Sequence, residues 1–270
     1  MARLMGIVNV TPDSFSDGGL FLEPERAIEH ARRLVDEGAD LLDVGGESTR
    51  PGARAVSAAE ELDRVGPVLE GVRAAEAPLA GAPISIDTSK VAVAEVALDI
   101  GAEIVNDVTA LRSEPQLAAL CAERGCGLVL MHMQGTPRTM QAAPHYEDVV
   151  REVADFFRQQ YRRALECGIE SMAIAFDPGI GFGKTVGHNL SLLGNLARLR
   201  LHDRPLVVGV SRKSSLGKMI GSDEMSDRLA PTVAFTALLR ERGANVLRVH
   251  DVRENAAALR VTEALLEAAP

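Results

Sequence analysis

Eight short apolar segments of the sequence each end in side chains that could do chemistry. One ends in Asp87, another in Asp177, and a third in Arg248 and His250. Carboxylates and amides suit a heterocycle with donors and acceptors on its edge, whereas cationic side chains suit a phosphate or pyrophosphate. One polar strand end is ordinary, because every strand must stop in a turn, but eight in succession predict a shared site. The eight ends carry Asn9, Asp43, Asp87, Asn106 with Asp107, Met131 with His132, Asp177, Ser211 to Ser214, and Arg248 with His250 and Asp251.

The segment from residue 43 to residue 52 is the most informative of these ends. The apolar residues 41–44 predict a buried strand, which then breaks into glycines, hydroxyl side chains, an arginine and a proline. A buried strand that ends in a polar loop with a cation is how an α/β enzyme builds one wall of an anion site. Asp43 precedes the glycines, so we expect it to lie deeper in the fold, in a supporting role.

The elements that must position these residues alternate along the chain. Stretches with helical periodicity separate the apolar segments. Four of them end in one pattern, a glycine followed by a small or apolar residue and a polar residue, and glycine supplies the left-handed stop. This repeated βα unit predicts a parallel sheet, and eight units in 270 residues predict a single-domain α/β fold, a (β/α)8 TIM barrel over residues 1–270. The apolar segments cover residues 4–10, 41–44, 84–86, 104–105, 127–131, 172–176, 206–210 and 246–249.

An open doubly wound sheet is the alternative fold. Its dinucleotide-binding version requires G-x-G-x-x-G after the first strand, and residues 11–16 read Thr-Pro-Asp-Ser-Phe-Ser instead. That version is therefore disfavoured.

The composition narrows the class of protein. Apolar residues make up 46% of the sequence and charged residues 25%, which is typical of a globular protein. The net charge of −9 argues against a general nucleic-acid binder. No stretch approaches the roughly 20 apolar residues of a membrane span, and the N-terminus lacks a signal-peptide pattern. We expect a cytoplasmic protein that binds neither nucleic acid nor membranes, and whose three cysteines are buried free thiols.

Two sharper motif interpretations are disfavoured. The run from Gly179 to Thr185 ends like a phosphate-binding P-loop, but that motif requires a glycine where the chain has Pro178. A glycine-rich loop that lets a flat ring approach the backbone is favoured, with Phe182 as a stacking face. His132 has no second histidine or cysteine at ligand spacing, so a place in the pocket wall is favoured over metal binding.

Taken together, these motifs resemble the dihydropteroate synthases, the folate-pathway enzymes that sulfonamides inhibit. The resemblance runs from near residue 5 to near residue 265, and residues 5–19 and 43–52, the mobile loops of that family, are its most specific parts. It implies a transferase that condenses 6-hydroxymethyl-7,8-dihydropterin pyrophosphate with 4-aminobenzoate to give 7,8-dihydropteroate and pyrophosphate. It also implies Mg²⁺ as a cofactor, sulfonamides as inhibitors, and a homodimer for which the last helix is the candidate contact. The other matching segments are 86–88, 106–108, 131–135, 176–184, 211–214 and 248–251.

The resemblance also implies a role for each matching residue. Asn9 would ligate Mg²⁺ and contact the pyrophosphate. Arg248 would both stack on the pterin ring and hold the pyrophosphate. The catalytic group would be Asp87, Lys213, Arg248 and His250. The pterin would be bound by Asp87, Asn106, Met131, Asp177, Phe182, Lys213 and Arg248. The 4-aminobenzoate and the pyrophosphate would be bound by Phe15, Thr49, Arg50, Pro51, Ser211, Ser214 and His250.

The chemistry of the residues agrees with these roles. A pterin presents its 2-amino group and N3–H side by side, and a carboxylate such as Asp177 can accept from both. Cleavage of the carbon–oxygen bond leaves a cation delocalised into the pterin, which Asp87 can stabilise. Ser214 opens a short predicted helix whose N-terminal N–H groups suit the carboxylate of 4-aminobenzoate. The loops at residues 11–19 and 47–55 would close to shut out water.

Two rival functions stay open at this point. Methyltransferases that move a methyl group from methyltetrahydrofolate to a corrinoid share a pterin-binding barrel, but they have no use for a pyrophosphate cluster or for the Thr49–Pro51 loop. A paralogue that binds pterin without turnover is the second rival, and the intact Asp87, Lys213 and Arg248 argue against it. Release of pyrophosphate from the two substrates would separate the three functions.

Overall fold

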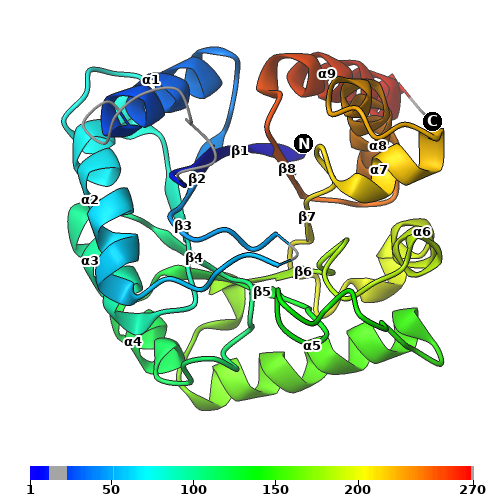
Figure 1. The fold of residues 1–270 in the computed structure, drawn as a ribbon, viewed down its shortest axis with the longest axis horizontal. Helices are drawn as coiled ribbons and strands as arrows, with labels where there is room; N and C mark the ends of the chain where they lie inside the picture. The colour runs from blue at the N-terminus through cyan, green and yellow to red at the C-terminus, as the bar shows by residue number, and fades with distance from the viewer. Residues whose placement is uncertain (12–22, 51, 269–270) are drawn as a thin grey trace.

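The computed structural model describes residues 1–11, 23–50 and 52–268, in which eight parallel strands form one sheet. The strand order is β6-β5-β4-β3-β2-β1-β8-β7, and a parallel bridge between Phe176 and Leu206 joins its two ends. The predicted (β/α)8 barrel is confirmed (Figure 1). The strands are β1 (Arg3–Asn9), β2 (Leu41–Gly45), β3 (Ile84–Asp87), β4 (Ile104–Asp107), β5 (Gly127–Met131), β6 (Ile174–Asp177), β7 (Val207–Val208) and β8 (Val246–Val249).

Helices surround the barrel and connect its strands (Figure 1). The glycines predicted to stop four of the helices, Gly38, Gly101, Gly168 and Gly243, have φ angles of 105°, 113°, 91° and 95°, in the left-handed region that favours glycine. The helices are α1 (Glu23–Asp36), α2 (Ala58–Arg73), α3 (Val91–Ile100), α4 (Leu117–Arg124), α5 (Val149–Glu166), α6 (Val186–Gly194), α7 (Ser214–Ile220), α8 (Leu229–Glu241) and α9 (Val252–Ala268). Short 3₁₀ turns include η3 (Ser171–Ala173) and η5 (Ser226–Arg228).

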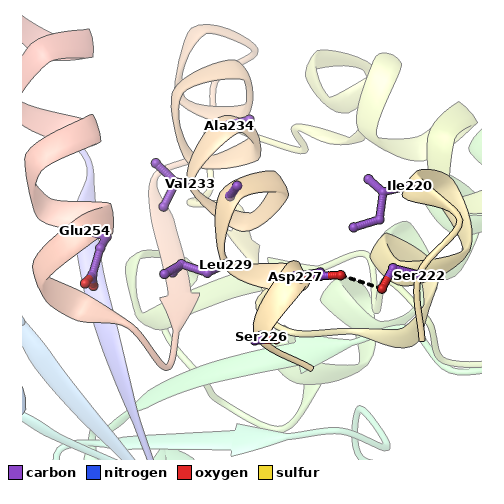
Figure 2. A pocket seen from close by; sticks show the side chains of 9 residues that line it. Ile220, Ser222, Ser226, Asp227, Leu229, Val233, Ala234 and Glu254 are labelled. Atoms are coloured by element: carbon purple, nitrogen blue, oxygen red, sulfur yellow. Dashed lines mark hydrogen bonds between the residues drawn. The ribbon is translucent and has the colours of Figure 1, made fainter. Parts of the chain in front are cut away.

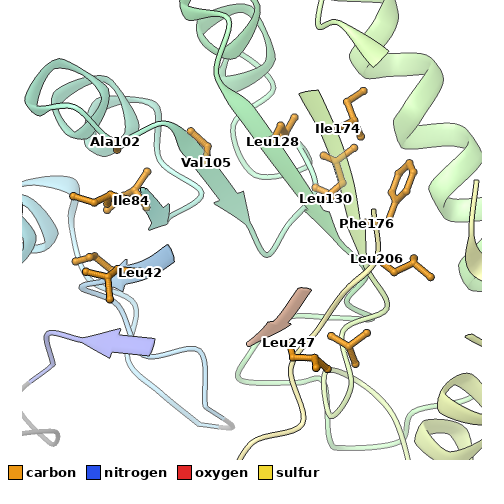
Figure 3. Packing of buried hydrophobic residues seen from close by; sticks show 14 of the residues in the cluster. Leu42, Ile84, Ala102, Val105, Leu128, Leu130, Ile174, Phe176, Leu206 and Leu247 are labelled. Atoms are coloured by element: carbon orange, nitrogen blue, oxygen red, sulfur yellow. The ribbon is translucent and has the colours of Figure 1, made fainter. Parts of the chain in front are cut away.

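Two apolar layers result from the alternation of side chains along each strand. Outward-facing residues such as Leu42, Ile84 and Leu247 pack under the helices (Figure 3). A smaller cluster, which we call the apolar plug, consists of Met5, Leu41, Val129 and Val207. Next along the same face of β2 comes Asp43, two residues after Leu41. The barrel interior therefore changes from apolar to polar toward the carboxyl ends of the strands, where barrel enzymes carry their sites.

Two expectations about individual residues need correction. Met172 was predicted to begin a strand, but it lies in the η3 turn with 75% of its surface exposed, and Arg204 contacts its sulfur. The apolar run begins two residues before the strand, which starts at Ile174. Cys121 and Cys126 are buried free thiols as expected, but Cys167, which caps the end of α5, is exposed.

The helices of the described residues also bear on membrane association. None of them combines the length and the apolar character needed to cross a bilayer.

Candidate active site

The strand register brings the predicted site residues level at the carboxyl ends of the strands. Asn9 pairs with Gly45, Gly45 with Asp87, and Asp87 with Asn106. Their side chains continue the inward-facing series that begins at the apolar plug. Gly45 keeps space open between its neighbours, because a Cβ at this position would approach the Cβ of Asp87 to 3.2 Å.

A buried cluster of charges joins β2, β3 and β8. Arg248 donates from Nε to Asp43 Oδ2 at 2.5 Å and from Nη2 to Asp87 Oδ2 at 2.8 Å. Asn106 Nδ2 donates to the same Asp43 oxygen at 3.2 Å, which leaves its amide oxygen to accept from a ligand. Asp43 is fully buried, as its place before the glycines predicted. Because both carboxylates hold the guanidinium by its edge, its flat face is left to contact a ring.

The cluster shifts the ionisation of its members. Burial opposes the charge of Arg248, but Asp43 and Asp87 outweigh that effect and raise its pKa above the ordinary arginine value. Burial raises the pKa of Asp87 to about 7 despite the attraction of Arg248, and nearby carboxylates such as Glu61 add to the rise. Asp87 therefore changes its protonation state near neutral pH.

A second cluster joins the loop after β6 to the turn after β7. Asp177 Oδ1 accepts the backbone N–H of Gly179 at 2.7 Å. The Lys213 ammonium donates to the carbonyl of Ile180 and lies 4.7 Å from the ring centroid of Phe182. Burial raises the pKa of Asp177 and lowers that of Lys213 to about 8, and the attraction between the two groups opposes both shifts. An acceptor, a donor and an aromatic face thus stand together, as recognition of a flat heterocycle requires.

Apolar side chains line this second cluster. Met131 is buried at the end of β5 and packs with Met133, Met140 and Phe182. Met131 is also level with Asp177 in the strand register. The structure therefore brings the residues predicted for the pterin into two adjoining clusters.

Lys184 is a buried residue that the sequence analysis weighed only as the end of a P-loop. Its Nζ lies 2.9 Å from His132 Nδ1 and 3.2, 3.0 and 2.9 Å from the carbonyl oxygens of His132, Gly179 and Phe182. Burial lowers the pKa of Lys184 to about 7. The sequence feature that could have identified Lys184 is a single lysine in an otherwise uncharged glycine-rich loop that follows a strand. Lys184 holds that loop against β5, and only glycine fits at position 179, where a Cβ would lie 1.9 Å from the His132 oxygen.

His132 itself lies next to the glycine-rich loop, where Lys184 contacts it. It is buried, and its ring packs edge-on against Phe156 with 4.9 Å between centroids. Burial, with the nearby charge of Lys184, lowers its pKa to about 2, so the ring is neutral. Among the described residues no group of three or more His, Cys, Asp and Glu side chains is placed to hold a metal ion.

His250 and Ser211 form a pair at the ends of β8 and β7. Ser211 Oγ accepts from the backbone N–H of His250 at 3.1 Å and lies 3.0 Å from its Nδ1. Burial, together with Arg248 and Arg212, lowers the pKa of His250 to about 3. At neutral pH His250 is therefore a neutral ring that can donate a hydrogen bond to phosphate. Arg212, which the sequence analysis left without a role, supplies a charge here and pairs with Asp251 through both carboxylate oxygens.

The residues predicted for 4-aminobenzoate are only partly within the described chain. Thr49 is partly buried, Arg50 is exposed, and the charge of Arg50 contributes to the lowered pKa of His250. Ser214 is exposed at the first position of α7. Phe15 and Pro51 lie outside the described residues.

Comparisons with known proteins identify relatives of the whole chain. The sequence profile of a family described as pterin binding enzyme matches residues 5–250. The dihydropteroate synthase of Escherichia coli K12 is 47% identical over 266 residues, which cover 98% of this chain and 92% of the relative. The Xanthomonas albilineans dihydropteroate synthase with 4-aminobenzoic acid matches at a TM-score of 0.91 and 46% identity, over 100% of this chain and 94% of that one. The Yersinia pestis enzyme in a sulfonamide drug complex matches at 0.91 and 42%, over 99% and 95%.

Proposed function

The chain belongs to the pterin binding enzymes and, among them, to the dihydropteroate synthases, and we propose that the two strand-end clusters carry out the reaction of that family. The reaction condenses 6-hydroxymethyl-7,8-dihydropterin pyrophosphate with 4-aminobenzoate and releases pyrophosphate. The observation that carries the proposal is the edge-on clamp of Arg248 between Asp43 and Asp87. It presents a fixed cation at the carboxyl ends of the strands, which we call the mouth of the barrel. A pterin and a leaving pyrophosphate would both need a cation there.

The pterin would lie between the two clusters. Asp177 can accept from the 2-amino group and N3–H, because a carboxylate offers two oxygens side by side. Asn106 offers its amide oxygen to the other ring edge, and Lys213 can donate to the ring carbonyl or a ring nitrogen. The face of Arg248 would stack on the ring, with the apolar wall at Met131 and Phe182 excluding water.

Bond breaking would begin with departure of the pyrophosphate. Arg248, with a hydrogen bond from His250, would neutralise the charge that grows on the leaving oxygen. The pterin then carries a delocalised cation, and an ionised Asp87 beside the ring would stabilise it. The aniline nitrogen attacks this cation and loses a proton, so no covalent intermediate with the enzyme is needed.

The 4-aminobenzoate would enter from the side of the loops after β1 and β2. Thr49 and Arg50 would cover it, and its carboxylate would face Ser211, Ser214 and the first N–H groups of α7. In the same way the sulfonamides, which one solved relative binds, would compete with 4-aminobenzoate here.

Mg²⁺ would be held mainly by the substrate. Asn9 and Asp87 offer hard oxygen donors, and Gly45 between them leaves space that a Cβ would fill. So few protein ligands suit Mg²⁺, which commonly keeps waters and binds through one or two carboxylates plus phosphate oxygens. When bound, the ion would add charge neutralisation at the pyrophosphate. Full turnover in the presence of a chelator would remove Asn9 from this role.

A homodimer would form through the face that carries α7, α8 and α9. On α9, Val261 and Leu265 are 71% and 63% exposed. A groove lined by Ile220, Leu229 and Val233 lies on the same face and reaches Glu254 in the first turn of α9 (Figure 2). Light scattering of the protein and of a Val261→Glu variant tests this assembly, and a monomeric parent protein would contradict it. The cytoplasm stays our prediction for its location.

Pyrophosphate release on mixing both substrates tests the function. We expect release that requires both substrates and a sulfonamide inhibition that added 4-aminobenzoate relieves. Pyrophosphate release that does not depend on 4-aminobenzoate would contradict the proposal, and so would the absence of any release. Methyl transfer from methyltetrahydrofolate without pyrophosphate release would favour the methyltransferase, and pterin binding alone would favour a non-catalytic paralogue.

A further inference from the structure

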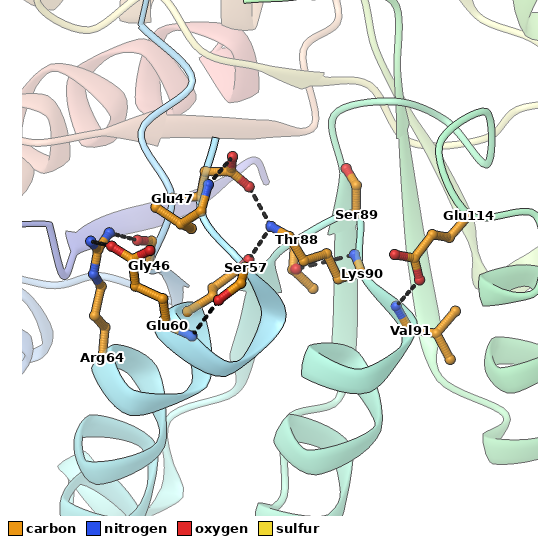
Figure 4. A network of polar contacts seen from close by, with 12 residues as sticks. Gly46, Glu47, Ser57, Glu60, Arg64, Thr88, Ser89, Lys90, Val91 and Glu114 are labelled. Atoms are coloured by element: carbon orange, nitrogen blue, oxygen red, sulfur yellow. Dashed lines mark hydrogen bonds and ion pairs between the residues drawn. The ribbon is translucent and has the colours of Figure 1, made fainter. Parts of the chain in front are cut away.

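Three charged residues that have no assigned part in substrate binding form a compact group next to the mouth. Lys90 donates from Nζ to Glu47 Oε2 and to Glu61 Oε2, each at 2.5 Å. They come from three separate elements: Glu47 follows β2, Glu61 lies in the first turn of α2, and Lys90 precedes α3. Figure 4 shows the surroundings of this charge triad.

The charge triad is well shielded from water. The side chain of Glu61 is 0% exposed, that of Lys90 18% and that of Glu47 27%. Burial alone would lower the pKa of Lys90, but its hydrogen bonds to both carboxylates raise it above the ordinary lysine value. Lys90 is therefore charged at any working pH and is the partner of two carboxylates at once.

The triad lies where the loop that carries Thr49 and Arg50 leaves β2, which we call the root of the loop. Glu47 Oε1 accepts the backbone N–H of Val56 at 3.3 Å, which closes the loop between its two ends. One residue before Glu47, the carbonyl of Gly46 accepts from Arg64 Nη1 of α2 at 2.7 Å. A loop tied at both ends in this way has less freedom than its length suggests.

Close packing fixes the same root against α2. A Cβ at Gly46 would lie 2.8 Å from Val65 Cγ1 and 3.0 Å from Glu61 Cγ, so backbone and helix touch directly. Ser57 caps α2 by accepting the N–H of Glu60 at 3.1 Å, and the chain enters this cap immediately after Val56. The loop thus leaves β2 at Glu47 and reaches α2 after Val56, and the hydrogen bond between these two residues connects its ends.

We propose that Lys90 is a positioning residue for the second substrate: through Glu47 it holds the root of the 47–56 loop so that Thr49 and Arg50 are presented to 4-aminobenzoate. This rests on the proposed function, since that function places the second substrate at the loop. Lys90 touches none of the residues of the two pterin clusters in the hydrogen bonds described above. Glu61 links the triad to the pterin side through its effect on the pKa of Asp87. Glu47→Ala keeps the Lys90–Glu61 pair and therefore perturbs the loop side without disturbing that link.

Steady-state kinetics of Lys90→Met, Lys90→Arg and Glu47→Ala test the proposal. The assays are run at pH 7.5, between the pKa of Asp87, about 7, and that of Lys213, about 8. We expect Lys90→Met and Glu47→Ala to raise the KM for 4-aminobenzoate about tenfold, the equivalent of one hydrogen-bonded charge contact. The KM for the pterin pyrophosphate should stay within about twofold, as a loop-only effect predicts. Lys90→Arg should recover most of the loss, because it restores the charge.

Arg124→Met is the matched control. Arg124 is the last residue of α4 and pairs at 2.6 Å with Asp99, near the end of α3 that is opposite to Lys90. The variant therefore removes a partly exposed cation that contacts α3 without touching the loop. It should keep both KM values. Equal changes in both KM values, or an unchanged KM for 4-aminobenzoate in the two test variants, would overturn the proposal.

Amide hydrogen exchange of the free protein gives a readout that needs no turnover. Lys90→Met should speed exchange in residues 48–50 and 52–56 and leave residues 104–107 of β4 unchanged. If the parent protein released no pyrophosphate, the proposed function would fail while this exchange test still decided the role of Lys90. If Lys90→Met did not fold, Glu47→Ala, which keeps the Lys90–Glu61 pair, would decide it, and unchanged exchange in residues 48–50 and 52–56 would overturn the proposal.

Discussion

The side of the site proposed for the pterin and the side proposed for 4-aminobenzoate are held by different kinds of contact. On the pterin side, Asp43 and Arg248 come from the strands themselves and pair inside the barrel. On the other side Thr49 and Arg50 stand on a loop that the charge triad holds only at its root. The first side is a preformed set of buried contacts that can orient a substrate, and the second is a loop that can cover one.

Removal of Arg248 should give the largest effect. Arg248→Met leaves Asp43 and Asp87 facing each other without a cation, and breaking a buried ion pair costs about 3–5 kcal/mol. Denaturant unfolding should show that loss, and kcat/KM should fall by at least about a hundredfold, the usual scale for one electrostatic catalytic group. Arg3→Met, which breaks an ion pair with Asp40 whose arginine is 65% exposed, is the control and should cost about 0–1 kcal/mol. Similar losses in the free energy of unfolding of both variants would contradict a preformed, buried ion-pair cluster on the pterin side.

Loss of Lys184 should come next. Lys184→Met removes the donor for carbonyls of the glycine-rich loop, and a buried acceptor without a donor costs about 1–3 kcal/mol. We therefore expect a lower free energy of unfolding and, by calorimetry, about tenfold weaker pterin binding, equivalent to about 1.4 kcal/mol. Wild-type pterin affinity in a folded variant would show that this loop does not depend on Lys184.

The pH dependence should report Asp87. Its raised pKa of about 7 means that it is protonated below that pH and then cannot stabilise a cation. The value of kcat/KM for the pterin pyrophosphate should fall about tenfold per unit as the pH drops below this pKa. Asp87→Asn should be slow at all pH values and lack this limb; a limb that persisted in the variant would assign it to another group.

Loss of Arg50 should give the smallest effect. Arg50 is exposed, and an exposed charge contact contributes about 0–1 kcal/mol. Arg50→Ala should therefore raise the KM for 4-aminobenzoate severalfold and leave the KM for the pterin pyrophosphate unchanged. A larger change in the pterin KM than in the 4-aminobenzoate KM would reverse the comparison between the two sides.

The sequence predicted the barrel because its signals are local. Apolar runs, helical periodicity and the glycine stops are each complete within one βα unit, and eight repeats of them determine the architecture. Asp43 shows how far this extends: its place before the glycines predicted burial and support, and the structure confirms both.

What the sequence could not supply were contacts between distant segments. Lys184 donates to the carbonyl oxygen of His132, 52 residues away, and Lys90 donates to Glu47, 43 residues away. The low pKa of His250, which burial and two nearby arginines cause, was likewise not predictable from its residue type. The solvent and charges around a side chain decide such properties, and they follow only from the assembled barrel.

Calorimetric titration of a pterin into the free protein tests most directly whether the two buried strand-end clusters bind the pterin. The parent protein should bind the pterin without 4-aminobenzoate. Asp177→Asn, which loses the double acceptor for the ring, should weaken that binding by about tenfold or more, since hydrogen bonds to charged groups contribute about 1.5–3 kcal/mol. Arg50→Ala should leave it unchanged. Equal affinities in Asp177→Asn and the parent protein would contradict the placement of the pterin on the buried strand-end clusters.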